Sequence, residues 1–471
     1  MMNRRRFLAN VGASVCATSL PAYAGANSSK PNILIIITDQ QSAEAASYRI
    51  GGRYIHTPNM DSVAARGTVF TRAYCANPLC VPSRTSMFTG QYPTATSVMD
   101  NSDAIDLTLT LTNYPRMFPM MGRVFQQAGY ETAYFGKWHI PCPVNRSDIH
   151  GFRVAKMGIG EFGSKSIDAV TAADAAAYLQ QEHGTPFLAV ASFLNPHNIA
   201  EWSRGQALPL GDIGPPPPLE ELPPLRANHA PQKDEPDTIT LMRRSYQSAP
   251  MFPVGEFDDT KWRQYQWAYY RLIEKVDAQI GIVLQALRAS GHVQDTLVVM
   301  MADHGDCQGA HRWNQKTVFY EEATRVPFVL TLPGATKPGQ SLRLVNTGID
   351  LMPTLCDFAG IAAPPNLPGL SVRDAASDPR RYIVVSDEML EGAPLNGRKP
   401  DPTGRMLRSQ RYKYCVYSEG ERRESLVDLE RDPGEMVNLA GDFSYCEILG
   451  RHRTMLAEWC RETHDAFCIP E

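Results

Sequence analysis

Polar residues that can bind a cation or transfer a proton follow four apolar runs in this sequence. Two carboxylates, an amide and an imidazole stand directly after two of these runs: Asp39, Gln40, Asp303 and His304. Oxygen ligands favour a hard ion such as Ca²⁺ or Mg²⁺, whereas the imidazole favours Mn²⁺. Each aspartate could instead cap a helix at a strand-to-loop junction. Lys137 and His139 stand at the end of a third run, and His197 follows a fourth. Taken alone, any one of these residues would be an ordinary loop residue, whereas the whole set indicates a ligand site.

The apolar runs that precede these residues predict buried parallel strands. They show no alternation of polar and apolar residues, and they span 32–38, 131–138, 187–194, 296–302 and 326–332. Helical stretches are expected between them, notably at 167–182 and 262–290. This alternation predicts an α/β fold with a mostly parallel sheet between helices. Ligands bind beyond the carboxyl ends of the strands in such sheets, so the polar residues above are expected at one edge.

The chain is expected to divide into a leader and two domains. Arg4-Arg5-Arg6-Phe7-Leu8, a mildly apolar run and Ala22-Tyr23-Ala24 resemble a twin-arginine export signal. We therefore expect residues 1–24 to be removed and the mature protein to be periplasmic or secreted. Residues 25–365 form the expected catalytic α/β domain, and short strands followed by a helix in 366–471 predict a smaller C-terminal α+β domain.

Composition and charge exclude several classes of partner. The 46 basic and 50 acidic side chains give a net charge of −4, so we expect no nucleic acid partner. Past residue 30 no apolar stretch is long enough to span a bilayer, and stable membrane insertion is not expected.

The Pro-rich stretch 208–253 predicts a long irregular segment, which either overhangs the site or forms a surface excursion. Export would permit disulfides among Cys446, Cys460 and Cys468.

The sharpest signal is the pentapeptide Cys80-Val81-Pro82-Ser83-Arg84. It resembles the signature of the sulfatase family, formylglycine-dependent enzymes of the alkaline phosphatase-like superfamily, in which the cysteine is oxidised to formylglycine (3-oxoalanine). Gly136-Lys137-Trp138-His139 resembles the second family signature. Ala302 to Asp306 and Gln315-Lys316 resemble its metal-binding and lysine-bearing segments. The resemblance extends over nearly the whole expected mature chain.

The resemblance implies a role for each candidate residue. Formylglycine made from Cys80 by a transiently bound maturase would be the nucleophile, held by Arg84, Lys137 and His139. Lys316 would bind the sulfate, and His197 would protonate the leaving oxygen. A weaker expectation places Asn101 at a sulfate or diol oxygen. The family also implies one divalent cation, with Ca²⁺ favoured over Mg²⁺ or Mn²⁺, on the ligands Asp39, Gln40, Asp303 and His304.

The metal ligands depart from the commonest family pattern. Many sulfatases carry two consecutive aspartates where this chain has Asp39-Gln40, and asparagine where His304 stands. Asp-Gln with Asp-His also resembles phosphonate monoester and phosphodiester hydrolases of the same superfamily. We favour a sulfatase that acts on a sulfated carbohydrate. A phosphonate or phosphodiester hydrolase and an inactive sulfate-binding protein are the alternatives.

Overall fold

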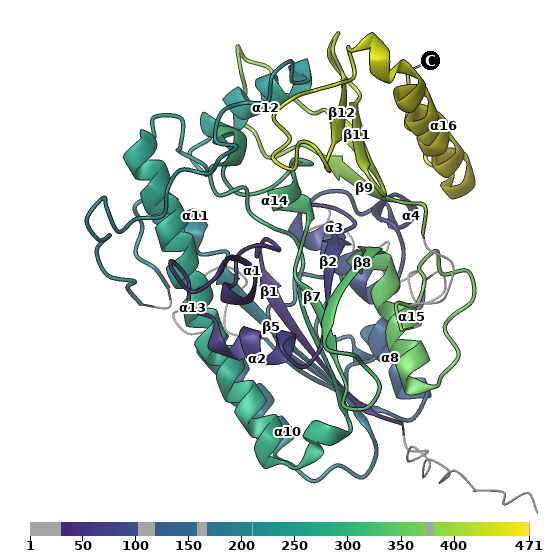
Figure 1. The fold of residues 1–471 in the computed structure, drawn as a ribbon. Helices are drawn as coiled ribbons and strands as arrows, with labels where there is room; N and C mark the ends of the chain where they lie inside the picture. Colours follow the sequence, from purple (N-terminus) through teal and green to yellow (C-terminus); the bar gives the residue numbers. More distant parts are fainter. Residues whose placement is uncertain (1–29, 102–117, 158–166, 210, 374–379, 471) are drawn as a thin grey trace, which may run out of the picture. The chain divides into compact units, whose positions relative to one another are not determined.

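The computed structural model describes residues 30–101, 118–157, 167–209, 211–373 and 380–470. The predicted export signal at 1–24 lies outside the described residues. Two sheets organise the described chain: an eight-stranded sheet and a four-stranded antiparallel sheet near the C-terminus (Figure 1). This arrangement confirms the predicted α/β class with a smaller C-terminal α+β part. The boundary placed at residue 365 stays a prediction.

The large sheet is mostly parallel, as predicted. Its order is β4-β3-β5-β1-β6-β7-β2-β8, and β7 alone runs antiparallel to both of its neighbours. The strands are β1 (Asn32–Asp39), β2 (Thr68–Tyr74), β3 (Glu131–Gly136), β4 (Val154–Lys156), β5 (Phe187–Pro196), β6 (Thr296–Ala302), β7 (Phe328–Thr331) and β8 (Gly339–Asn346). All five strands expected from apolar runs are present, whereas β2, β4 and β8 carry more polar sequences and were not predicted.

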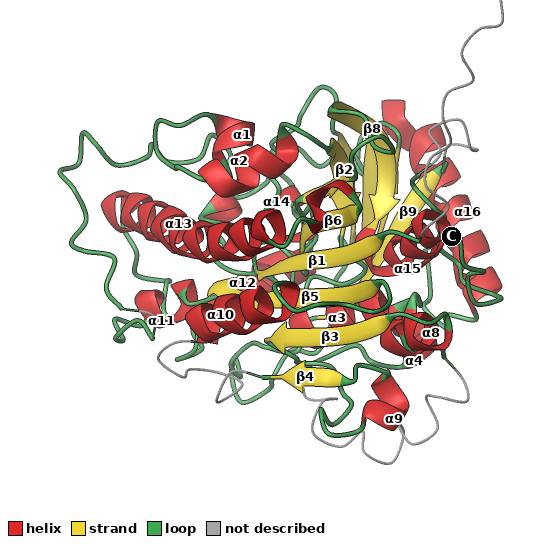
Figure 2. Ribbon diagram, turned by 90° about the horizontal axis from the view of Figure 1, so that it is seen from below, coloured by secondary structure: helices red, strands yellow, loops and turns green. Residues whose placement is uncertain are grey.

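The central strands are buried on both faces because helices cover each side of the sheet (Figure 2). Leu34 and Ile36 of β1 pack in one apolar layer with α2 (Pro58–Ala64), α10 (Ile167–Leu179) and α13 (Asp259–Ala289). Ile33 and Ile35 face the other layer, with α3 (Cys80–Thr89), α8 (Met121–Gln127) and α15 (Thr347–Ala359). Burial on both faces explains the continuous apolar run that identified β1 in the sequence.

The C-terminal sheet has the order β12-β11-β10-β9 and is antiparallel throughout. Its strands are β9 (Tyr382–Glu388), β10 (Thr403–Ser409), β11 (Tyr412–Tyr417) and β12 (Glu424–Asp428). Leu407, Tyr414 and Leu426 share an apolar cluster with Leu456 and Trp459 of α16 (Cys446–Thr463). The terminal helix therefore covers one face of this sheet.

The Pro-rich stretch between residues 208 and 253 is less irregular than predicted, because it contains the helix α12 (Asp237–Gln247). The stretch contacts both the loop before α14 (Glu321–Thr324) and the C-terminal sheet region. Examples are the His229 to Gly309 and Ser245 to Ala393 hydrogen bonds, at 2.7 and 2.6 Å. The remaining short helices are α1 (Ser47–Ile50), α4 (Pro93–Thr96), α9 (Ser147–His150), α11 (Ile199–Ser203), η1 (His292–Gln294), η2 (Ala310–Arg312) and η3 (Phe443–Tyr445).

None of the described helices is both long and apolar enough to cross a bilayer. Cys446, Cys460 and Cys468 are free thiols in the structure, as are the other described cysteines.

Gly136, the last residue of β3, provides a test of how the sheet positions the lysine that follows it. Its φ is +96°, and a Cβ there would lie 2.0 Å from the carbonyl oxygen of Ser192 on β5. We expect Gly136→Ala to lower the free energy of unfolding by about 3 kcal/mol, from left-handed strain plus a backbone clash. Activity should fall as well, because Lys137 would be displaced.

Gly129→Ala is the matched control for this substitution. Gly129 has a similar φ of +89°, but a Cβ there would meet nothing within 4 Å. Strain alone should cost about 1 kcal/mol. Urea denaturation of the two variants separates the effects, and equal losses would show that the contact with Ser192 is unimportant.

Candidate active site

The candidate residues meet at the carboxyl edge of the large sheet. Asp39 ends β1 and Asp303 follows β6, and the pairing of Thr38 with Ala302 places these aspartates side by side. Lys137 follows β3 directly, and His197 follows β5. The parallel register therefore brings together side chains from four strands, as the sequence predicted.

Arg84 joins the two aspartates from the helix beyond the sheet. Its Nη2 donates to Asp39 Oδ2 and its Nε to Asp303 Oδ2, each at 2.8 Å. Its Nη1 donates to Ser192 Oγ at 2.9 Å and to the carbonyl oxygen of Lys137 at 3.1 Å. The side chains of Arg84 and both aspartates are completely buried. This guanidinium is thus held by four acceptors from four segments of the chain.

The two aspartates differ in their ionisation. Burial raises the pKa of Asp39, but Lys137 and Arg84 outweigh it and hold this pKa well below its usual range. The Lys137 Nζ lies 2.6 Å from Asp39 Oδ2. Burial, together with repulsion from Asp39, raises the pKa of Asp303 to about 6. The pair therefore carries at least one firmly fixed negative charge facing the helix α3.

Cys80 begins α3 and lies among cationic groups. Its Sγ is 3.0 Å from Lys316 Nζ, 3.2 Å from His304 Nε2 and 3.8 Å from Lys137 Nζ. Burial raises the pKa of the Cys80 thiol, but Lys137 and Lys316 outweigh it, so the pKa lies well below its usual range. A fully buried position with this surplus of positive charge favours an anion at residue 80.

The imidazoles of His139 and His197 complete the surroundings of the Cys80 sulfur. Burial lowers the pKa of both imidazoles, while hydrogen bonding to Cys80 opposes this effect. Lys316 and Lys137 further lower the pKa of His197. His139 is buried, whereas His197 is partly exposed. Of these two histidines, His197 is therefore the more accessible.

The ligand atoms of the predicted cation site converge beside Cys80. Those of Asp39, Asp303 and His304 lie, together with the Cys80 sulfur, within 4.8 Å of one another. The Gln40 Oε1 also faces this point, since it accepts a hydrogen bond from Lys316 Nζ at 3.1 Å. Two carboxylates, an amide oxygen and an imidazole are a suitable ligand set for one divalent cation. The residues present therefore fit the metal that the sequence implied.

A second buried group with ligand-type atoms consists of His311, Glu322 and Glu435. Its carboxylates already have cationic partners: Arg226 Nη2 lies 2.8 Å from Glu322, and Lys413 Nζ lies 2.5 Å from Glu435. This group is a buried ion-pair network that supports the loop carrying Lys316.

Two acidic residues near the site were given no role by the sequence. Asp306 Oδ2 accepts from Gln40 Nε2 at 2.8 Å, which turns the amide oxygen of Gln40 toward Lys316. Its place in the Asp303 to Asp306 motif is a signal that could have found it. Glu391 accepts a hydrogen bond from Asn101 Nδ2 at 3.3 Å, and Asn101 Oδ1 accepts from the backbone N–H of Val81 at 3.0 Å. No local pattern marks Glu391.

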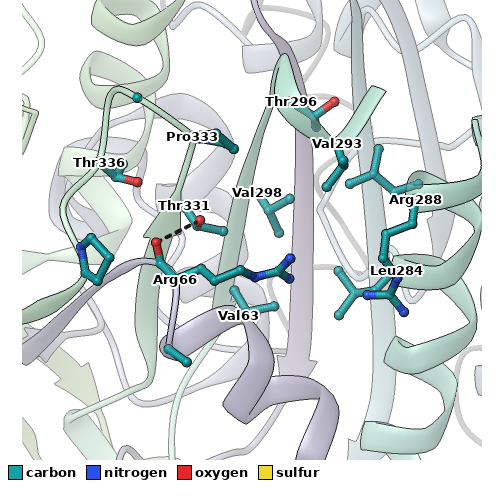
Figure 3. Close-up of a pocket in the computed structure, with 14 residues that line it drawn as sticks. Val63, Arg66, Leu284, Arg288, Val293, Thr296, Val298, Thr331, Pro333 and Thr336 are labelled. Carbon is teal, nitrogen blue, oxygen red and sulfur yellow. Dashed lines mark hydrogen bonds between the residues drawn. The ribbon is translucent and has the colours of Figure 1, made fainter. Parts of the chain in front are cut away.

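A separate cavity of about 320 Å³ lies at the opposite end of the sheet, near the start of β6 (Figure 3). Apolar side chains such as Val63, Leu284 and Val298 line it, with Arg66 and Arg288 as its charged members. It contains no cysteine, histidine, lysine or carboxylate. Its threonine hydroxyls therefore have no general base among the lining residues to activate them.

Comparison with known proteins agrees with this geometry. A family model described as Sulfatase matches residues 31–361. A second model, described as N-sulphoglucosamine sulphohydrolase, C-terminal, matches residues 309–462.

Individual relatives match most of this chain. The Delta 4,5-hexuronate-2-O-sulfatase of Bacteroides thetaiotaomicron is 34% identical and covers 97% of this chain and 93% of its own. The Ulvan-active sulfatase of Formosa agariphila is 28% identical over 88% of this chain and 77% of its own. A solved structure of a 2-O GAG sulfatase superposes with a TM-score of 0.80 at 31% identity, covering 94% of this chain and 95% of that chain.

The fold is shared more widely than the chemistry. A phosphonate monoester hydrolase of Agrobacterium radiobacter superposes with a TM-score of 0.72 at 21% identity, covering 92% of this chain and 96% of that chain. At this identity the likeness shows the fold alone.

The central place of Arg84 can be tested by Arg84→Lys in protein stripped of metal by a chelator. A lysine cannot reproduce the fork that contacts both aspartates, so one buried carboxylate would lose its partner. We expect the free energy of unfolding to fall by about 3 kcal/mol or more, measured by urea denaturation. Arg146→Lys, at an exposed ion pair with Asp148, is the control and should leave stability unchanged. Equal behaviour of the two variants would contradict the structural role of Arg84.

Proposed function

Because the chain belongs to the sulfatase family, we propose that it hydrolyses sulfate esters of saccharides with a formylglycine formed from Cys80. One observation carries the proposal: Cys80 is fully buried at the sheet edge, beside Lys316, Lys137 and His304. These groups surround the position where the negative charge of a sulfate ester would lie.

The side chains around position 80 have separate tasks in this reaction. Formylglycine, as its hydrate, supplies two hydroxyls on one carbon, the first to attack sulfur and the second to allow release of sulfate. Lys137 and Lys316 provide fixed positive charge on the reacting group, and Arg84 acts through Asp39 and the Lys137 backbone to hold its place. Because these donors are buried and hydrogen-bonded before substrate arrives, they need little reorganisation during the reaction.

Proton transfer to the leaving oxygen is assigned to His197. This residue is partly exposed, whereas His139 and Lys316 are buried, so it is the more accessible acid for a leaving oxygen. Burial lowers its pKa in the free protein, and the charges of Lys316 and Lys137 lower it further. A bound sulfate would offset their charge and favour the protonated imidazole that the leaving oxygen requires.

A divalent cation would be held by four side chains: Asp39, Gln40, Asp303 and His304. When bound, it supplies Lewis-acid chemistry at the sulfate oxygens. Ca²⁺ is favoured, since three of the four ligands are oxygen donors. The Asp306 carboxylate supports this role because it fixes the orientation of the Gln40 amide.

A sulfated saccharide is the substrate class that the relatives support. The relatives are named as acting on a hexuronate 2-O-sulfate and on ulvan, and a 2-O GAG sulfatase shares the fold at 31% identity. A hexuronate 2-O-sulfate is therefore the first substrate to test. The Arg4-Arg5-Arg6-Phe7-Leu8 leader supports a periplasmic or secreted location, where such a saccharide would be met. Cell fractionation tests this location.

Sulfate release from a panel of esters tests the activity. The panel contains 4-nitrophenyl sulfate, a 2-O-sulfated unsaturated uronate disaccharide and the phosphodiester bis(4-nitrophenyl) phosphate. Release of sulfate from the first two, far exceeding phosphodiester cleavage, is the expected result. Preferential cleavage of the phosphodiester would instead support the related phosphohydrolase activity. This activity is the alternative because Gln40 stands where many sulfatases carry a second aspartate.

Maturation of Cys80 gives a prediction that does not depend on the substrate. In a host with the maturase, mass spectrometry should show the peptide containing residue 80 with an aldehyde in place of the thiol. Cys80→Ser should fold with unchanged stability, because the exchange is nearly isosteric, but lose turnover by at least a thousandfold. An unmodified Cys80 in a fully active preparation would contradict the proposed nucleophile.

His197→Ala should distinguish substrates by their leaving groups. An alkoxide leaving group needs a proton in the transition state, whereas 4-nitrophenolate does not. We expect kcat to fall by about 10²-fold or more on a saccharide sulfate and far less on 4-nitrophenyl sulfate. His183→Ala, at a histidine paired with Glu131 on another part of the sheet, is the control. Equal losses on both substrates would assign the proton to another group.

A further inference from the structure

A carboxylate lies beside the anion-binding centre, although neither the proposed nucleophile nor the cation site uses it. Glu391 follows β9 and belongs to the C-terminal part of the chain. The Asn101 amide links it to helix α3. Asn101 Oδ1 accepts from the Val81 N–H at 3.0 Å, and Asn101 Nδ2 donates to Glu391 Oε1 at 3.3 Å. The Asn101 side chain thus connects Glu391 to Val81, the residue that follows Cys80.

The electrostatic surroundings of Glu391 belong to the active site. Burial raises the pKa of Glu391, and Lys316 is the strongest influence that lowers it, with His304 also lowering it. Cys80 and Asp100 raise this pKa by repulsion. Lys316 therefore interacts electrostatically with both residue 80 and Glu391.

A carboxylate at this place must gain a partner when substrate binds, since it would otherwise only repel the sulfate. An ionised carboxylate accepts hydrogen bonds and donates none. Asn101 supplies one hydrogen to Oε1, while Glu391 is only partly buried, so its remaining acceptor sites are open to a ligand. The missing partner is therefore a hydrogen-bond donor on the substrate, next to the sulfate.

The charge of the surroundings indicates a neutral donor. Lys316 already lies close enough to compensate the Glu391 charge electrostatically. The neighbouring Asp387 is fully buried, and neither of its oxygens has a hydrogen-bond partner in the described part of the chain. Burial raises the pKa of Asp387 well above its usual value, and repulsion from Glu391 adds to this effect, so the pair disfavours a second negative charge here. An additional cation is not needed for charge balance.

We propose that Glu391, positioned by Asn101, forms an acceptor subsite that binds the hydroxyl on the carbon next to the sulfate ester of a saccharide. The inference rests on the proposed sulfatase function and adds the position of a neighbouring group. The subsite also discriminates against a second sulfate on the adjacent carbon, because that anion would lie against the Glu391 carboxylate. Glu391 is thus a specificity-determining residue contributed by the C-terminal part of the protein.

Two pairs of sulfate esters test the subsite by masking one hydroxyl. The first pair is 2-hydroxyphenyl sulfate and 2-methoxyphenyl sulfate. The second is a methyl hexuronide 2-O-sulfate and its 3-O-methyl ether. For each pair the ratio of kcat/KM, hydroxyl over ether, is measured in the wild type and in Glu391→Ala and Glu391→Gln. Comparing ratios between variants cancels the intrinsic reactivity of each ester.

We expect Glu391→Ala to reduce this ratio about tenfold or more, as the loss of a hydrogen bond to a charged acceptor requires. Glu391→Gln should give an intermediate ratio, since its amide oxygen still accepts. Asp401→Asn is the matched control, because Asp401 lies on the same loop with an exposed carboxylate, and it should keep the wild-type ratio. A thermal unfolding midpoint for each variant shows that the fold is intact.

The outcomes separate the subsite from the function on which it rests. Hydrolysis of either pair with the same ratio in wild type and Glu391→Ala overturns the subsite and leaves the sulfatase function standing. A reduced ratio in Asp401→Asn as well would assign the effect to the loop as a whole and also overturns it. If wild type hydrolyses no sulfate ester at all, the proposed function fails, and the subsite fails with it.

Discussion

The Arg84 guanidinium makes it possible to bury two aspartates side by side at the end of a parallel sheet. Asp39 and Asp303 each lie 2.8 Å from it, and all three side chains are excluded from solvent. Two adjacent carboxylates in such a place would be costly without a fixed countercharge. Arg84 is also one helical turn after Cys80, so both side chains share a face of α3. The contact that neutralises the aspartates therefore also places the reactive position above them.

The backbone around this ion pair is held in unusual conformations. Gln40, His139, Gln315 and Thr317 have φ values of +69°, +43°, +59° and +66°. Such conformations cost about 1–2 kcal/mol for residues other than glycine, and surrounding contacts must compensate for them. The Gln40 carbonyl oxygen accepts from Tyr269 at 2.6 Å, and the Gln315 carbonyl oxygen accepts from the Cys307 N–H at 2.7 Å. The local strain thus lies in the segments that aim side chains at position 80.

The segment that carries Lys316 depends on remote parts of the chain. Lys413 of β11 donates to the Phe319 carbonyl oxygen at 2.6 Å, and the His311 N–H donates to the Asn228 carbonyl oxygen at 2.7 Å. One contact comes from the C-terminal sheet and the other from the Pro-rich stretch. These parts, which contain no residue of the cation site, therefore hold the lysine in place, and Glu391 shows that the C-terminal part also reaches the substrate side.

The sequence alone determined the central strands and the residue types that follow them. Burial on both faces requires continuous apolar runs, and an ion or anion site requires polar groups where those runs end, so both features are visible locally. The edge strands β4 and β8 escaped detection because half-exposed strands tolerate mixed sequences. Only the tertiary structure revealed α12 packed against the Lys316 loop and Glu391 beside Asn101. Glu391 lies 290 residues from Asn101, and such a contact arises from the packing of separate layers, which no short pattern records.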